Sequence, residues 1–238
     1  MISLDNKVSV ITGGSRGIGA STALLLAKAG SNIVLNYLRN KQRATFVADQ
    51  IKALGRAVIV HQGNVALQHE ASNLIERTTL EFGKVDIVVN NAGIWTYGEI
   101  GSMGEKLWDE TIEINLKSVF NICNSVVPHL KRNGGGRIIN ISSSAGQRGE
   151  AFHSHYAASK GGILAFTKSI AAELAPYGIL VNAVAPGWVD TEMNEGVFGN
   201  PEFRNQVLEA IPLKKIATAE DVAGAVLFLA SDYARHVT

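Results

Sequence analysis

The segment Tyr-Ala-Ala-Ser-Lys places a phenol, Tyr156, four residues before an amine, Lys160. Side chains at this spacing share one face of a helix, one turn apart. A free tyrosine has a pKa of about 10, so proton transfer near neutral pH requires about 4 kcal/mol of selective stabilisation of its phenolate. An ammonium about 5 Å away supplies about 3 kcal/mol at an effective dielectric constant of 20. The pair suits acid–base chemistry at a tyrosine, although the same spacing also occurs as an ordinary exposed helix pair.

A glycine-rich turn near the N-terminus has a spacing that suits a phosphate. The apolar run at residues 7–12 leads into Thr-Gly-Gly-Ser-Arg-Gly-Ile-Gly and then into a helical pattern. Gly13, Gly17 and Gly19 would let the backbone approach a pyrophosphate, and the following helix would add unpaired amides and the positive end of its dipole. A tight strand-to-helix turn without a ligand would use the same glycines, so the turn alone leaves both interpretations open.

An alternation of strands and helices positions these segments. Six β-branched runs are each followed by a stretch in which apolar residues recur every three or four positions. The runs are residues 7–12, 32–37, 57–61, 85–89, 137–141 and 179–184. They are almost continuously apolar, which is typical of strands covered on both faces. The pattern predicts an α/β fold: a single domain over residues 1–238, with a doubly wound parallel sheet, right-handed crossovers and helices on both faces.

Residues 190–212 interrupt this alternation, because they offer a helix with no strand after it. Such a segment predicts a lid over a site, with a plain surface helix as the alternative. No linker, charge block or internal repeat divides the chain.

The composition argues against several classes of partner. The chain has 22 Lys and Arg against 21 Asp and Glu, so its formal charge of +1 creates no net field for nucleic acid or an anionic membrane. The single cysteine, Cys123, cannot form an internal disulfide, and no Cys/His cluster has metal-ligand spacing. No apolar run approaches the roughly 20 residues of a membrane span. We expect a cytoplasmic protein with no metal, nucleic-acid or membrane partner.

Taken together, the motifs resemble those of the short-chain dehydrogenase/reductase family. In family order, the chain has the glycine turn, Asn-Asn-Ala-Gly after the fourth strand, Asn115 in a helix, Ile-Ser-Ser-Ser-Ala-Gly, Tyr-Ala-Ala-Ser-Lys and Pro-Gly-Trp-Val-Asp-Thr. The resemblance extends from Lys7 to the last residue and is strongest to the 3-oxoacyl-[acyl-carrier-protein] reductases within the family. It implies a sheet of the Rossmann type and an oxidoreductase that uses a nicotinamide dinucleotide.

The resemblance implies four catalytic residues. Tyr156 would protonate the carbonyl oxygen while hydride arrives, and would act as the general base in the reverse direction. Lys160 would lower the pKa of Tyr156 and hold the nicotinamide ribose, and an oxidised nicotinamide would add further stabilisation of the phenolate. Ser143 lies thirteen residues before the tyrosine, as the family serine does, and would donate to the substrate oxygen. Asn115 would anchor a water that returns the proton through the lysine.

The resemblance also implies a set of cofactor contacts. They are Gly13, Ser15, Arg16, Gly17, Ile18 and Gly19 in the turn; Asn36, Tyr37 and Arg39 after the second strand; Asn64 and Val65 after the third; Asn91, Ala92 and Gly93; Tyr156 and Lys160; and Pro186, Gly187, Val189 and Thr191. Asn64 departs from the usual family Asp, but an amide can still bond the adenine.

The residues after the second strand bear on the choice of dinucleotide. An acidic side chain there would accept from a ribose 2′-hydroxyl and repel a 2′-phosphate, but none is present. Arg16 and Arg39 would instead pair with the phosphate. A solvated loop charge is the alternative interpretation of Arg39. We therefore expect NADP(H), with NAD(H) less favoured.

The substrate remains open at this level. The nearest resemblance points to a 3-oxoacyl thioester or a small ketone, a sugar, polyol or other alcohol is the alternative within the family, and a dinucleotide-sensing module is the alternative outside catalysis. Trp95, His153, His155 and Trp188 each adjoin a motif and either contact substrate or pack elsewhere.

Two kinds of protein partner follow from the resemblance. An acyl carrier protein is an uncertain one: Lys131 and Arg132 lie near one expected basic contact, but Tyr177 stands at the second. A homodimer or homotetramer is expected through the helices at 105–131 and 155–175 and through a seventh strand. Since the 238 residues contain no seventh strand, we expect the helix contact to survive and the strand contact to be weakened or absent.

Overall fold

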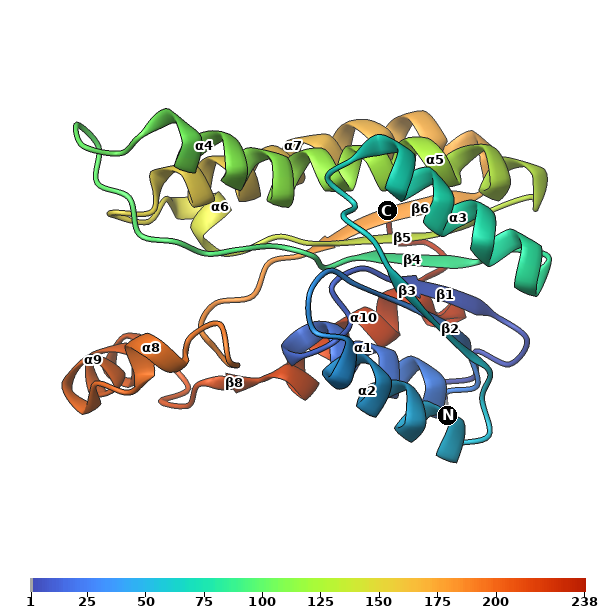
Figure 1. The fold of residues 1–238 in the computed structure, drawn as a ribbon, viewed down its shortest axis with the longest axis horizontal. Helices are drawn as coiled ribbons and strands as arrows, with labels where there is room; N and C mark the ends of the chain where they lie inside the picture. The colour runs from blue at the N-terminus through green and yellow to red at the C-terminus, as the bar shows by residue number, and fades with distance from the viewer. Residues whose placement is uncertain (1) are drawn as a thin grey trace.

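A computed structural model describes residues 2–238. Within them, a six-stranded sheet has the order β3-β2-β1-β4-β5-β6, and every neighbouring pair is parallel (Figure 1). The strands are β1 (Val8–Ile11), β2 (Asn32–Tyr37), β3 (Val58–Gln62), β4 (Ile87–Asn90), β5 (Gly136–Ile141) and β6 (Ile179–Val184). All six lie within two residues of the predicted runs, and the strand order reverses between β1 and β4. The doubly wound sheet is therefore confirmed.

Helices cover both faces of the sheet, as predicted (Figure 1). On one face lie α3 (Gln68–Phe82), α4 (Glu105–Ile112), α5 (Ser118–Arg132), α6 (Ala145–Arg148) and α7 (Ser154–Leu174), and on the other α1 (Gly17–Lys28), α2 (Lys41–Ala53) and α10 (Ala219–Ala230). The strands need this cover because successive side chains point to opposite faces. Val10 and Val88 lie in the core under α3, α5 and α7, whereas Ile11 and Val89 lie in the core with α1, α2 and α10. Each central strand thus contributes alternate side chains to the two cores.

The long helix predicted at 105–131 is not uniform. Between α4 and α5 the chain forms a π-helical turn, Glu113–Lys117, which contains the buried Asn115. Such turns are rare, and they occur frequently at functional sites. The other long helix, predicted at 155–175, is found as α7 and a following 3₁₀ turn, Ala175–Tyr177.

The segment predicted as a lid projects from the sheet (Figure 1). It contains α8 (Glu195–Phe198) and α9 (Pro201–Ala210). The expectation that no strand follows its helix was wrong. β7 (Val189–Asp190) pairs in parallel with β8 (Ala217–Thr218), so two short strands join the beginning of the segment to its end. A two-residue strand has too few residues to show an alternating pattern, which is why the sequence gives no sign of it.

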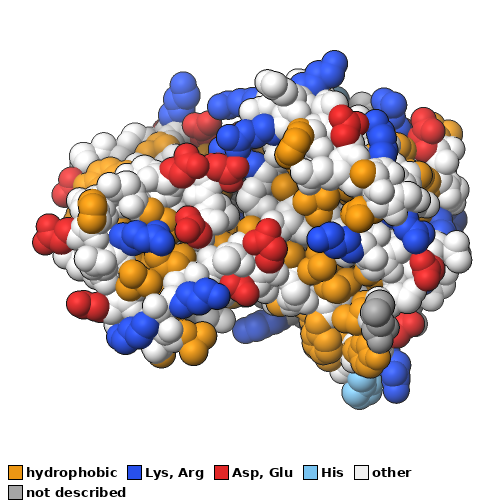
Figure 2. Space-filling model, turned by 90° about the horizontal axis from the view of Figure 1, so that it is seen from below, with side chains coloured by type: hydrophobic (Ala, Val, Ile, Leu, Met, Phe, Trp, Pro, Cys, Tyr) orange, Lys and Arg blue, Asp and Glu red, His pale blue; other side chains and the backbone are white. Residues whose placement is uncertain are grey.

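Acidic and basic side chains are interspersed over the face that carries α1, α2 and α10, with apolar groups between them (Figure 2). No helix within residues 2–238 has the length and apolar character to cross a bilayer. The same residues contain no cluster of three His, Cys, Asp or Glu side chains that could hold a metal ion.

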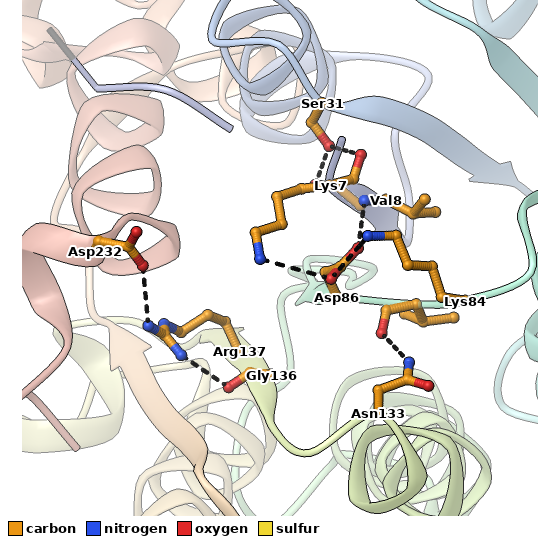
Figure 3. Close-up of polar contacts among 11 residues, drawn as sticks. Lys7, Val8, Ser31, Lys84, Asp86, Asn133, Gly136, Arg137 and Asp232 are labelled. Carbon is orange, nitrogen blue, oxygen red and sulfur yellow. Dashed lines mark hydrogen bonds and ion pairs between the residues drawn. The ribbon is translucent and has the colours of Figure 1, made fainter. Parts of the chain in front are cut away.

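Asp86 holds together the amino-terminal edge of the sheet (Figure 3). Its carboxylate accepts the backbone amide of Val8 at 2.9 Å and lies 3.1 Å from Lys84 Nζ and 3.8 Å from Lys7 Nζ. The side chain is 17% exposed, so these contacts are only partly screened by water. At the same edge, Arg137 of β5 pairs with Asp232 beyond α10.

We expect Asp86→Ala to lower the free energy of unfolding by about 1.5–3 kcal/mol, because the Val8 amide loses a charged acceptor. Urea unfolding measures the change. Asp49→Ala is the matched control, since the Asp49 carboxylate is 62% exposed and its pair with Lys52 should contribute less than about 1 kcal/mol. Equal losses in the two variants would contradict the role given to Asp86.

Candidate active site

The glycine turn after β1 has the conformation that a dinucleotide site needs. Gly13 and Gly17 have φ values of 63° and 51°, in the left-handed region that favours glycine. A Cβ on Gly19 would overlap the Gly13 carbonyl oxygen and the Asn91 amide group. Asn91 Nδ2 donates to the carbonyl oxygens of Thr12 and Gly13 at 3.0 and 3.1 Å. The Asn-Asn-Ala-Gly segment thus braces the turn from the neighbouring strand.

The N-terminus of α1 fits a phosphate. Among the described residues no side chain caps this helix, and its first turn contains no acidic residue. By contrast, Asn40 caps α2 by accepting the Arg43 amide. The first amides of α1 therefore need a partner, which a bound pyrophosphate would supply. The turn fits the dinucleotide that the sequence predicts.

The predicted cofactor residues of this region divide into two groups. Asn36 and Tyr37, the last residues of β2, are buried, and their side chains bond the end of β3 and the residue after it: Asn36 Nδ2 donates to Gly63 O at 3.0 Å, and the Tyr37 hydroxyl donates to Gln62 at 3.4 Å. Arg16 and Arg39 are exposed and form no ion pair within residues 2–238. The two guanidinium groups remain available to a ligand.

Two charged residues that the sequence did not single out lie beside the turn. Arg43 of α2 forms an ion pair with Glu192, which begins the lid segment. The Glu192 carboxylate would lie 3.7 Å from a Cβ built on Gly17. The pair joins residues 149 positions apart, so no local pattern could have indicated it.

Asn64 and Val65, predicted to hold the adenine, follow the end of β3. Asn64 Oδ1 accepts the Ala66 amide at 3.1 Å, which leaves its NH₂ group for a ligand. Val65 is buried in the core below α3 and α5. Val65 thus offers a ligand only its backbone.

Three of the four predicted catalytic residues meet in one cleft at the carboxyl ends of β4, β5 and β6. Its lining includes Ser143, Tyr156 and Lys160 together with seven predicted cofactor residues: Ile18, Asn91, Gly93, Pro186, Gly187, Val189 and Thr191. The fourth, Asn115, is buried behind this lining. The cleft thus brings predicted catalytic and predicted cofactor residues together.

The three consecutive serines after β5 have different surroundings. Ser142 is buried and donates to the Lys160 carbonyl oxygen at 2.8 Å, so its hydroxyl fixes α7 against β5. Ser143 lines the cleft with Tyr156 and accepts the Ala145 amide at 3.1 Å. This arrangement supports Ser143 as the serine that contacts substrate.

Asn115 positions the loop after β4. Its Oδ1 accepts the Ile94 amide at 2.8 Å, and its Nδ2 donates to Ile94 O at 2.9 Å and to Ser159 Oγ at 3.0 Å. A Cβ on Gly93 would lie 3.2 Å from Asn115 Oδ1 and 3.5 Å from Lys160 Nζ. The π-helical turn thus brings a buried amide next to the lysine. The water-anchoring role of Asn115 stays a prediction.

The electrostatics of the pair differ from the expectation. Burial raises the pKa of Tyr156, the neighbouring Ser143 hydroxyl opposes this, and the charge of Glu150 adds to it. Burial also lowers the pKa of Lys160 from 10.5 to about 8. The Lys160 ammonium lies 5.8 Å from the Tyr156 ring centroid and donates to the Ile141 carbonyl at 2.8 Å. In the protein alone the pKa of Tyr156 is therefore raised rather than lowered, and burial is the largest cause.

The sequence left open whether Trp95, His153, His155 and Trp188 contact substrate or pack elsewhere, and the structure places the tryptophans and the histidines differently. Trp95 and Trp188 line the cleft, and their ring centroids are 5.9 Å apart. His153 stacks on Trp95 with ring centroids 4.3 Å apart. His155 is buried, and its Nε2 lies 2.9 Å from Thr96 Oγ1. The tryptophans are thus candidate substrate contacts, and the histidines support them or pack nearby.

Comparison with known proteins agrees with this geometry. A family model described as enoyl-(acyl carrier protein) reductase matches residues 13–238, nearly the whole chain. The chain belongs to the short-chain dehydrogenase/reductase family. As a member, it is an oxidoreductase that acts on a carbonyl or hydroxyl group and uses a nicotinamide dinucleotide.

Individual relatives of this short-chain dehydrogenase/reductase are similar over their full length. The chain is 42% identical to the 3-oxoacyl-[acyl-carrier-protein] reductase FabG of Staphylococcus epidermidis, with 98% of this chain and 95% of the relative covered. It is 41% identical to a 3-oxoacyl-[acyl-carrier-protein] reductase of Synechocystis, with 98% and 92% covered. A solved structure described as a putative short-chain alcohol dehydrogenase from Sinorhizobium meliloti has a TM-score of 0.95 at 31% identity, and 99% of this chain and 93% of that chain are covered.

The lowered pKa of Lys160 predicts a pH-dependent stability. Below about pH 8 the folded protein must bury the ammonium, whereas between about 8 and 10.5 it has released a proton that the unfolded chain still binds. The wild-type free energy of unfolding should therefore rise with pH in this window, relative to a variant without the lysine. We expect Lys160→Met to be more stable than wild type at pH 7, and this advantage to fall by about 3 kcal/mol as the pH rises from 7 to 10.5.

Urea unfolding at pH 7 and pH 10 measures this difference. Lys168→Met is the matched control, because Lys168 is an exposed lysine on the same helix. A stability difference between Lys160→Met and wild type that stays constant with pH would show that the ammonium is not destabilised by burial.

Proposed function

We propose that this protein is an NADP(H)-dependent carbonyl reductase that converts a 3-oxoacyl thioester or a small ketone to a secondary alcohol. The observation that carries the proposal is that the hydroxyl residues Ser143 and Tyr156 line one cleft together with the buried Lys160. Two hydroxyl groups that line the same cleft can both donate to one substrate oxygen. That arrangement matches a carbonyl oxygen on which negative charge develops.

The side chains have distinct parts in such a reaction. Tyr156 is protonated at neutral pH, since its pKa lies above the ordinary value, and it is therefore the proton donor. Ser143 donates a second hydrogen bond and holds the carbonyl in place. Lys160 carries a positive charge below about pH 8 and stabilises the phenolate that Tyr156 becomes. When bound, the nicotinamide supplies the hydride and, once oxidised, a positive charge.

The substrate class rests on both the relatives and the site. Two relatives are named 3-oxoacyl-[acyl-carrier-protein] reductases, whereas the family description names an enoyl reductase. The paired hydroxyls favour reduction of a carbonyl over reduction of a carbon–carbon double bond. Ser143, Tyr156 and Lys160 in one cleft also favour an enzyme over a dinucleotide-sensing module. A sugar or polyol dehydrogenase remains the second candidate within the family.

Protein partners belong to the same proposal. Lys131 Nζ lies over the Tyr177 ring at 3.7 Å from its centroid, so the basic position and the uncharged one predicted from the sequence are neighbours. An acyl carrier protein therefore meets one positive site here rather than two. Self-association through α4, α5 and α7 is supported by exposed apolar side chains on α4 and α5: Trp108 is 41% exposed and Phe120 is 48% exposed.

We expect Tyr156→Phe to abolish turnover while NADPH binding changes little, because the substitution removes the proton donor alone. Steady-state NADPH oxidation with acetoacetyl-CoA measures turnover, and fluorescence titration measures binding. Tyr233→Phe, at an exposed tyrosine outside the cleft, is the matched control. If Tyr156→Phe kept more than about a tenth of the wild-type rate, the loss would be below about 1.4 kcal/mol and the proton donor would be another group.

We expect NADPH to bind more tightly than NADH, because Arg16 and Arg39 are free to pair with a 2′-phosphate. Arg39→Gln should reduce that preference by about tenfold or more, since a charge-assisted contact contributes about 1.5–3 kcal/mol. Dissociation constants for both cofactors measure the preference. Arg56→Gln, which removes a partner of Asp5, is the control. Equal constants in wild type, or constants that favour NADH, would overturn the assignment.

A further inference from the structure

Two tryptophans face each other beside the catalytic hydroxyls, and we call them the aromatic bridge. Trp95 lies in the loop after β4, and Trp188 lies between β6 and β7; both line the cleft with Ser143 and Tyr156. Their ring centroids are 5.9 Å apart with the planes at 84°, which is an edge-to-face contact. An alkyl chain passing between two rings needs about 7–8 Å, because each carbon–carbon contact takes about 3.5–4.0 Å. The bridge therefore leaves no passage between its rings.

The Trp95 side of the bridge is held by its neighbours. His153 stacks on Trp95 with the ring planes 5° apart, so the stacked ring backs one face of the indole. Trp95 Nε1 donates to Glu150 Oε1 at 3.3 Å, and His153 Nδ1 lies 3.8 Å from the same carboxylate oxygen. A stacked ring and a hydrogen bond together fix the position of the indole.

The Trp188 side is held by the lid segment. Phe198 of α8 and Phe203 of α9 pack against Trp188, with ring centroids at 5.6 and 5.7 Å. Moving Trp188 out of the cleft would therefore require both short helices to move as well. The aromatic contacts run from α9 through Trp188 and Trp95 to His153 at the start of α7.

The rest of the cleft fits a substrate that ends before the bridge. Ile94 and Met193 add apolar surface near the tryptophans, whereas Arg148 and Gly149 line the cleft and are exposed. In the orientation proposed below, the thioester group reaches solvent past these exposed residues and the acyl tail points toward the bridge.

We propose that Trp95 and Trp188 determine specificity by limiting the acyl tail, so that the enzyme reduces short 3-oxoacyl thioesters and small ketones and discriminates against long-chain ones. This inference rests on the proposed carbonyl reductase activity. The inference assigns the exclusion of long acyl chains to Trp95 and Trp188, because the hydroxyl groups of Ser143 and Tyr156 contact only the carbonyl and do not select chain length.

The test is kcat/KM for acetoacetyl-CoA and for 3-oxododecanoyl-CoA with NADPH as the reductant. Wild type should favour the short thioester by roughly a hundredfold. Trp188→Ala and Trp95→Ala should each reduce that ratio at least about tenfold, through faster reduction of the long thioester.

Tyr97→Ala is the matched control. Tyr97 contacts His153 edge-on and stacks on Phe152, but it is 63% exposed and is not part of the cleft lining. The ratio of kcat/KM values for the short and long thioesters in Tyr97→Ala should equal the wild-type ratio. If Tyr97→Ala changed this ratio as much as Trp188→Ala does, the cause would be a general loosening of the loop rather than a limit set by the bridge. Thermal unfolding of each variant shows that it is folded.

The outcomes separate the inference from the proposed function. Equal kcat/KM for both thioesters in wild type would overturn the limit and leave the carbonyl reductase intact. Reduction of no carbonyl substrate would overturn the proposed function. In that case, calorimetry with 3-hydroxybutyryl-CoA and 3-hydroxydodecanoyl-CoA on the protein with NADP⁺ still tests the bridge: tight binding of the short thioester alone, relaxed in Trp188→Ala, supports it, and equal affinities overturn it.

Discussion

Burial of the Lys160 ammonium beside Tyr156 is the constraint on which the site depends. The charge is unfavourable in this place, as its lowered pKa shows, and the surrounding elements are needed to hold it there. Ser142 binds the Lys160 carbonyl and Ile141 accepts from its ammonium, so the end of β5 fixes the start of α7 at two points. A Cβ on Gly146 would overlap the Lys160 backbone, which shows how closely α6 and α7 approach. The position of the ammonium is thus maintained at the expense of local stability.

The two edges of the sheet have separate tasks. At the carboxyl edge, the segments after β4, β5 and β6 bring glycines, hydroxyls and tryptophans into one cleft, as is usual for ligand sites in open parallel sheets. At the amino edge, Asp86 and Arg137 join strand ends through charges and backbone groups, far from that chemistry. Because the buried strands connect the two edges rigidly, contacts at one edge preserve the geometry of the other.

Much of this could be predicted from the sequence, and the reasons for success and failure are physical. Strands such as Asn32–Tyr37 are found because a buried strand has a continuous β-branched run, and the glycine turn because its backbone conformation restricts residue type. The π-helical turn at Asn115 was missed, since its apolar spacing matches an ordinary helix. The Trp95–Trp188 contact was missed because it joins distant loops. The raised pKa of Tyr156 depends on burial, which two residues at helical spacing do not reveal.

Because β7 pairs with β8, the segment predicted as a lid begins and ends at neighbouring points of the structure. It is therefore an excursion of the chain away from the main sheet. Between these strands only Val207 and Ile216 are buried, and neither belongs to the two cores that flank the sheet. Local unfolding of this excursion would therefore expose little apolar surface and leave the main sheet intact. Its amides should exchange with solvent deuterium through such openings, well before those of β1 or β4, and its peptide bonds should be the first that a protease reaches.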